Sequence, residues 1–191
     1  MRLFAVSAFI TLLLSPPSGA LHRAPPPGDR FADETAVRGA LEGIFGRDGA
    51  ISVVPRPIVI DSTGRAAISK VSKSPFADDT LRIYVCRKGD SLAGYGIVDN
   101  VRGKSRDITY MLILNAAGEV ASVEILIYRE SHGGEVAGSA FRDQFSGKKS
   151  GDRLVAGRDI KTISGATISS RSVTAGVAKL LAAFDRVRGR I

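Results

Sequence analysis

The chain has 191 residues and a net charge of +8 at pH 7, with one cysteine and two histidines. That length supports one domain with a sizeable core, but a single cysteine excludes internal disulfides. Cysteines and histidines are also too few for a zinc site built from those ligands, which takes about three or four of them. The dispersed basic excess favours anionic partners, such as acidic proteins, phosphate groups or a membrane surface. The lack of an aromatic and basic motif argues against nucleic acid.

The N-terminus has the pattern of an export signal. Residues 3–14 form an apolar run, followed by two prolines and by the small residues Ser18 and Ala20, which suit cleavage after Ala20. The run is shorter than the roughly 20 residues that cross a bilayer, and an uncleaved membrane anchor is the alternative. We therefore expect a signal peptide over 1–20 and a Pro-rich tether over 21–32. The protein is then exported, to the periplasm or to the outer face of the cytoplasmic membrane.

Three segments with different patterns follow the tether. Residues 33–46 place apolar side chains at helical spacing behind an acidic first turn, which predicts an amphipathic helix. Residues 51–60 are apolar and β-branched but contain two prolines, which favours an edge strand or an extended loop. Residues 61–73 suit a second short helix with Asp61 or Ser62 as its cap.

The second half of the chain begins with β-rich segments separated by turn signals, a pattern that predicts a meander of antiparallel strands. These segments are 81–88, 92–101, 108–115 and 120–128. Residues 137–145 are helix-like, and an apolar stripe from Val173 to Val187 predicts a terminal helix. We therefore expect a single α+β domain in which helices flank an antiparallel β-sheet. Cys86 lies in an apolar run, which suits a core residue better than a reactive thiol.

A cluster of hydroxyl side chains precedes the terminal helix, in the stretch TISGATISS at residues 162–170. Gly165 allows a positive φ, and Thr167, Ser169 or Ser170 can cap the helix, whose first N–H groups have no internal partners. A helix N-terminus also favours a phosphate or another anion. From the residues alone, a simple cap and an anion site both remain open.

The same cluster resembles the flavin attachment motif of the FMN-binding domain family. That family includes the G subunit of Rnf-type complexes, the C subunit of the sodium-pumping NADH:quinone reductase and small exported flavoproteins. ITYMLIL, VASVEILIYRESHGGEV and FRDQFSGK are similar to further parts of the family, so the resemblance covers roughly residues 80–185. We therefore divide the domain into an N-terminal part, 33–79, and an FMN-binding domain, 80–191.

The resemblance implies that FMN is covalently joined to Thr167 through a phosphoester, which a flavin transferase adds outside the cytoplasm. In the family an acidic residue stands three positions before the Ser of the motif. Here that position is Lys161, and Asp159, two residues earlier, is the candidate to replace it.

The other expected cofactor-binding residues form groups by role. Some shape the turn around the phosphate, some approach the flavin ring or the ribityl chain, and a basic residue favours the anionic reduced flavin. The first group is Ser164, Gly165 and Ala166, with Ser169 from the same cluster; the second is Glu130, His132, Gly133 and Gly134; the third is Lys148. A loop with two glycines can also be simply a turn, and this alternative to the second group stays open.

The function implied by the resemblance is electron transfer by an exported flavoprotein. Its partners would be redox proteins or a membrane electron-transport complex, and it would act as a carrier rather than as an enzyme that turns over a substrate. The alternatives are a module that binds FMN or another anion without a covalent bond, and a scaffold component of a membrane redox complex.

Overall fold

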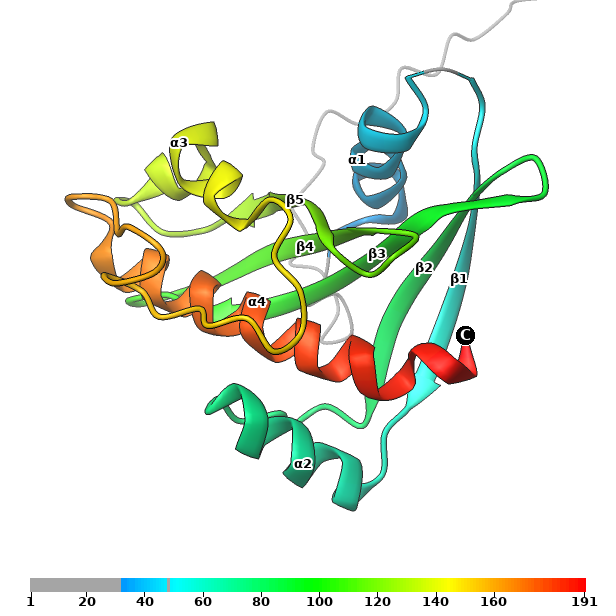
Figure 1. The fold of residues 1–191 in the computed structure, drawn as a ribbon. Helices are drawn as coiled ribbons and strands as arrows, with labels where there is room; N and C mark the ends of the chain where they lie inside the picture. The colour runs from blue at the N-terminus through cyan, green and yellow to red at the C-terminus, as the bar shows by residue number, and fades with distance from the viewer. Residues whose placement is uncertain (1–31, 48) are drawn as a thin grey trace, which may run out of the picture.

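The structure is a computed structural model that describes residues 32–47 and 49–191. The expected signal peptide, and all of the tether except Ala32, lie outside the described residues. One five-stranded sheet is flanked by helices on both of its faces (Figure 1). The predicted α+β fold with an antiparallel sheet is therefore confirmed. No helix in the described ranges is long and apolar enough to cross a membrane.

The sheet is an antiparallel meander, because its strands lie side by side in chain order from β1 to β5. The strands are β1 (Ser52–Val59), β2 (Thr80–Lys88), β3 (Ser91–Arg102), β4 (Asp107–Asn115) and β5 (Val120–Tyr128). All four strands predicted after residue 80 are present. Short turns connect them, and such turns require consecutive strands to pair with each other.

The first strand, β1, lies at one edge of the sheet and carries Pro55 and Pro57 opposite Tyr84 and Arg82 of β2. Proline has no N–H group for a strand ladder and is therefore restricted to edges. Of the two alternatives predicted for this segment, the edge strand is the one that forms.

Side chains alternate across the sheet and form one apolar core on each face. In β4, Leu112 and Leu114 belong to one core, while Met111 and Ile113 belong to the other. The first core is covered by α4 (Thr167–Val187), the predicted terminal helix, and by α2 (Ser62–Ser72), which packs on it. The second core is covered by α1 (Glu34–Phe45), on the opposite face (Figure 1).

The two N-terminal helices begin at aspartate caps. Asp33 accepts hydrogen bonds from the N–H groups of Thr35 and Ala36 at the start of α1. Asp61 accepts one from Gly64 N at 2.6 Å at the start of α2, so Asp61 rather than Ser62 is its cap. A carboxylate at this position also suits the positive end of the helix dipole.

Short pieces replace the single helix predicted over 137–145. They are η1 (Gly134–Ala137), α3 (Ser139–Arg142) and η2 (Asp143–Phe145). Phe141 and Phe145 are both fully buried. After Phe145 the chain leaves the helical conformation, and Gly147 N and Lys148 O bond to the backbone of Val120, each at 2.8 Å, at the start of β5.

A polar group lies buried between α4 and the sheet. Lys179 Nζ is 2.7 Å from Asp99 Oδ2, and the two side chains are only 10% and 9% exposed. The hydroxyl of Tyr110 donates to the same Asp99 oxygen at 3.0 Å. Burial, together with the Asp99 carboxylate, raises the pKa of Tyr110 well above its usual value. These contacts satisfy a carboxylate that would otherwise be costly to bury.

Candidate functional site

The helix α4 begins without a side-chain cap. Its N-cap residue is Ala166, and no side chain of the described residues accepts a hydrogen bond from its first turn. The prediction that Thr167, Ser169 or Ser170 caps this helix is therefore wrong. The physical reason is position: Thr167 is already the first helical residue, and both serine hydroxyls have partners elsewhere.

The turn before α4 contains the two small residues of the SGAT motif, which is residues 164–167. Gly165 has a φ of +79°, a left-handed conformation that glycine adopts without strain. No atom lies within 4 Å of where a Cβ would be, so the space beside this residue is open. Ala166 is buried, and its N–H donates to Ile163 O at 3.0 Å. Ser170 Oγ accepts from Ile163 N at 3.2 Å and fixes the same turn from the helix side.

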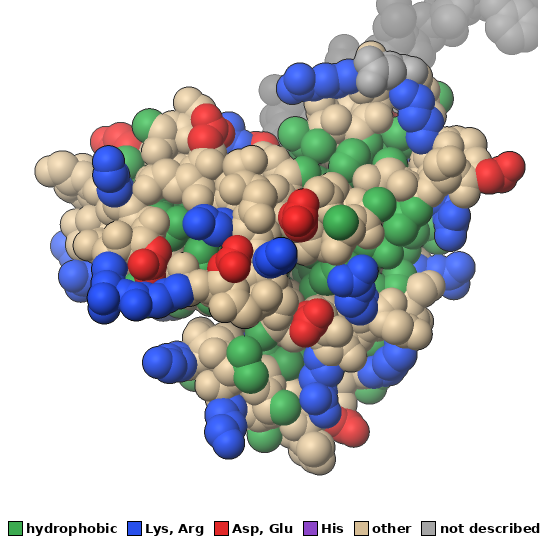
Figure 2. Space-filling view, in the orientation of Figure 1, with side chains coloured by type: hydrophobic (Ala, Val, Ile, Leu, Met, Phe, Trp, Pro, Cys, Tyr) green, Lys and Arg blue, Asp and Glu red, His purple; other side chains and the backbone are tan. Residues whose placement is uncertain are grey.

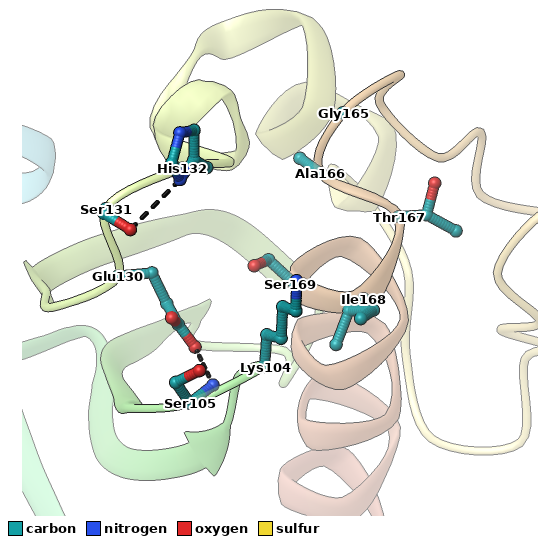
Figure 3. Close-up of a pocket in the computed structure, with 10 residues that line it drawn as sticks. All are labelled: Lys104, Ser105, Glu130, Ser131, His132, Gly165, Ala166, Thr167, Ile168 and Ser169. Carbon is teal, nitrogen blue, oxygen red and sulfur yellow. Dashed lines mark hydrogen bonds between the residues drawn. The ribbon is translucent and has the colours of Figure 1, made fainter.

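An open pocket of about 360 Å³ lies in front of this turn (Figure 3). Segments far apart in the sequence form its walls: the turn between β3 and β4, the loop after β5, and the start of α4. The lining residues are Lys104, Ser105, Glu130, Ser131, His132, Gly165, Ala166, Thr167, Ile168 and Ser169. Such a volume is within the range of sites for small molecules and cofactors.

Tyr128, at the end of β5, ties two walls of the pocket together. Its hydroxyl donates to His132 O at 2.6 Å and shares a hydrogen bond of 2.9 Å with Ser169 Oγ in the first turn of α4. Gly133 has a φ of +87°, and a Cβ there would lie 2.7 Å from the Tyr128 hydroxyl oxygen. The glycine therefore permits the close approach on which both hydrogen bonds depend. Gly134 follows it at the start of η1, near the Tyr128 ring but outside the pocket lining.

Glu130 lines the pocket, but its carboxylate is directed toward the β3–β4 turn (Figure 3). Its Oε1 atom accepts hydrogen bonds from Ser105 N at 2.6 Å and from Arg106 N at 2.9 Å. These backbone bonds, led by the one from Arg106, lower the pKa of Glu130. The side chain is therefore ionised and fixes the turn, and its approach to the flavin ring or the ribityl chain stays a prediction.

The hydroxyl of Thr167 has no hydrogen-bond partner among residues 32–47 and 49–191. In Figure 3 it points outward from the start of α4, away from Glu130 and His132. Ser164, three residues before Thr167, is exposed and does not line the pocket. His132 does line the pocket, where its Nδ1 atom is 3.0 Å from Ser131 Oγ.

Lys148, expected at the cofactor, lies elsewhere. Its backbone oxygen accepts from Val120 N at the start of β5, whereas the pocket is at the end of that strand, beside Tyr128. The backbone of Lys148 and the pocket are therefore separated by the length of this strand, about 25 Å. Lys104 contributes the lysine of the pocket instead, and the sequence interpretation missed it.

The segment before the SGAT motif is held by the side chain of Gln144. Its Oε1 accepts from Lys161 N at 2.7 Å, and its Nε2 donates to Lys161 O at 3.2 Å. Asp159, the candidate for the missing acidic residue, accepts from Arg153 Nε at 3.2 Å and from Val155 N at 3.0 Å. Its carboxylate thus fixes its own loop.

Basic side chains are scattered over the face that α4 crosses and form no single block (Figure 2). The pocket has a more defined electrostatic character. It receives the uncapped, positive end of α4 and the Lys104 ammonium, while the negative charge of Glu130 is engaged by backbone N–H groups. This combination suits an anionic ligand.

Comparison with known proteins connects this site to a family. Residues 103–182 match the FMN-binding domain family. The chain is 26% identical over 110 residues to the G subunit of the Na(+)-translocating ferredoxin:NAD(+) oxidoreductase complex of Acetobacterium woodii, covering 52% of this chain and 53% of that one. The chain therefore spans about half the length of this relative. Its fold is similar to the crystal structure of Shewanella oneidensis NqrC, with a TM-score of 0.52 and 18% identity, covering 78% of this chain and 88% of that chain.

The resemblance seen in the sequence is confirmed, because residues 103–182 match the FMN-binding domain family. The matched range runs from the β3–β4 turn through β4 and β5 to α4, and so contains every residue that lines the pocket.

Proposed function

We propose that this protein carries FMN on Thr167 through a phosphoester bond and passes electrons between redox partners outside the cytoplasm. The observation that carries the proposal is the Thr167 hydroxyl, which is unpartnered among the described residues at the uncapped start of α4 within an FMN-binding domain.

The residues around Thr167 fit a flavin phosphate. The first N–H groups of α4 have no side-chain cap and suit phosphate oxygens. The open space beside Gly165 leaves room for the phosphate at the turn. Ile168, which is 48% exposed, adds apolar surface at the pocket for an aromatic ring. The bound FMN supplies the redox chemistry, and the protein supplies its position and its electrostatic surroundings.

Attachment balances chemically when FAD is the donor. The Oγ–P bond to Thr167 forms as the pyrophosphate bond of FAD breaks, AMP leaves, and the hydroxyl loses its proton. The exposure of Ser164 and Gly165 makes the acceptor accessible to a flavin transferase. A covalent bond prevents loss of FMN where the cofactor cannot readily be replaced, which agrees with the expected export.

The test is the intact mass of the protein after maturation with a flavin transferase. We expect one FMN on the wild-type chain, none on Thr167→Ala, and one on Thr162→Ala, the matched control from the same hydroxyl cluster. Peptide mapping should place the added mass on Thr167. Flavin that stays on Thr167→Ala after denaturation would contradict the linkage, and flavin released from the wild-type chain by denaturation and filtration would support non-covalent binding instead.

A role within a membrane redox complex is the second candidate. It is favoured by the similarity to the G subunit of an ion-translocating oxidoreductase complex. In that case the protein should co-purify with membrane proteins of such a complex, and Thr167→Ala should still co-purify if the role is only that of a scaffold. A chain that purifies alone from gently solubilised membranes would argue for an independent carrier.

A further inference from the structure

The turn between β3 and β4 is short and tightly closed. Gly103 N donates to Arg106 O at 2.8 Å, and Arg102 pairs with Asp107 across the ends of the two strands. A Cβ on Gly103 would lie 2.5 Å from Glu130 Oε1 and 2.8 Å from Arg106 O. The turn and the Glu130 carboxylate are therefore packed against each other without room for a side chain at this position.

Glu130 holds this turn by binding its backbone. Two successive N–H groups, those of Ser105 and Arg106, converge on a single carboxylate oxygen. Convergent backbone N–H groups of this kind form an anion-binding concavity, which here is filled by a side chain of the same protein. The lowered pKa of Glu130 agrees with an ionised carboxylate in that concavity. The conformation of the turn therefore depends on Glu130.

Lys104 occupies the middle of this turn and lines the pocket. In Figure 3 its side chain extends from the turn toward the first turn of α4. It forms no ion pair with any carboxylate in the described part of the chain. The turn thus presents an uncompensated ammonium group to the pocket.

We propose that Lys104 is the counter-charge of the bound flavin and that Glu130 is a positioning residue, which acts by fixing the turn that carries Lys104. This inference rests on the proposed function. A positive charge beside the flavin stabilises its anionic groups and favours the reduced, more negative form over the oxidised form. Lys104 therefore raises the midpoint potential of the bound FMN.

The experiment measures the midpoint potential of the flavinylated full-length protein by spectroelectrochemistry. Lys104→Gln should keep FMN on Thr167 but shift the potential to a more negative value, and Lys104→Arg should restore most of the wild-type potential. Lys148→Gln removes an equal charge at the far end of β5 and should leave the potential unchanged. Equal potentials for Lys104→Gln and the wild type, or equal shifts for Lys104→Gln and Lys148→Gln, would overturn the role of Lys104.

The positioning role of Glu130 has a separate measurement. Glu130→Gln should increase amide hydrogen exchange at Ser105 and Arg106, and Lys104→Gln should shift the potential less in the Glu130→Gln background than in the wild type. Unchanged exchange in Glu130→Gln, or an equal Lys104→Gln shift in both backgrounds, would contradict action through the turn.

A failure of the proposed attachment can be recognised separately, because the wild-type mass would then lack FMN. In that case free FMN is titrated into the unmodified protein and its fluorescence is followed. Loss of one charge-assisted hydrogen bond should weaken binding about tenfold in Lys104→Gln. Lys148→Gln should bind like the wild type, and equal affinities for all three proteins would reject Lys104 as a flavin contact.

Discussion

The hydroxyl of Tyr128 lies 2.9 Å from Ser169 Oγ and so joins the end of β5 to the first turn of α4. The same hydroxyl donates to His132 O, which fixes the loop between these elements. One phenol therefore determines how the sheet, the loop and the helix meet around the pocket.

Tyr128→Phe should loosen the start of α4 without unfolding the protein. Removing the hydroxyl leaves His132 O and Ser169 Oγ without this partner, at a cost of about 1 kcal/mol in the free energy of unfolding. We expect slower flavin incorporation, followed as intact mass against time with a flavin transferase. Tyr95→Phe is the control, because the Tyr95 ring packs against Phe184, far along α4. Equal incorporation rates for both variants would show that the hydroxyl is not needed to position Thr167.

Gln144→Ala should free the chain at Lys161. The Gln144 amide pairs with both the N–H and the carbonyl of Lys161, so amide hydrogen exchange at Lys161 should become faster. Gln144→Glu keeps the shape but directs a second acceptor at Lys161 O, and it should also lose protection. Asp143 is an exposed neighbour of Gln144, and in Asp143→Ala the Lys161 amide should exchange at the wild-type rate. Unchanged protection in Gln144→Glu would mean that shape alone holds the segment.

The buried pair of Lys179 and Asp99 should be strongly coupled. Lys179→Met leaves the Asp99 carboxylate without its cation and should lower the free energy of unfolding by about 3 kcal/mol in urea titrations. Adding Asp99→Asn should recover part of that loss, because asparagine still accepts the Tyr110 hydrogen bond without a charge. The exposed pair Arg102 and Asp107 is the control, and Arg102→Gln should cost less than about 1 kcal/mol. Additive effects of Lys179→Met and Asp99→Asn would contradict the coupling.

Cys86 should behave as an inert thiol in the folded protein. Burial raises its pKa from 9.0 to about 11, so the thiolate is scarce at pH 8. We expect almost no reaction with a disulfide reagent at pH 8 before urea is added and complete reaction afterwards. Because the folded pKa is raised, this thiol favours the folded state below pH 9, and that contribution declines as the pH rises from 9 toward 11. Fast labelling of the native protein would show that the core opens at β2.

Most of the fold could be predicted because local signals agree with it. The turn signals after Lys88 and Asn115 require consecutive strands to pair, and the apolar stripe from Val173 to Val187 is the buried face of α4. The helix predicted over 137–145 forms instead as a short α-helix and a 3-10 turn over residues 139–145.

Several residues that line the pocket were named from the sequence, whereas Lys104 was not, and the reason is physical. Which lysine approaches the SGAT turn depends on strand register: Ile108 pairs with Tyr128, which brings the β3–β4 turn and Lys104 beside the end of β5. No local pattern in the sequence contains that register. Likewise, the hydroxyl of Ser169 fits a cap, and only the fold shows that Tyr128 competes for it.

The prolines of β1 have a consequence for assembly. Pro55 and Pro57 lie two residues apart in the strand at the open side of the sheet, so two successive donors that an incoming strand would need are missing. At the other edge of the sheet, the backbone of β5 already has hydrogen-bond partners. Val120 bonds to the backbones of Gly147 and Lys148, and the Arg142 side chain donates to Val123 O at 3.0 Å. Both borders thus discourage the addition of a strand from another molecule, which protects the sheet against aggregation through its edges.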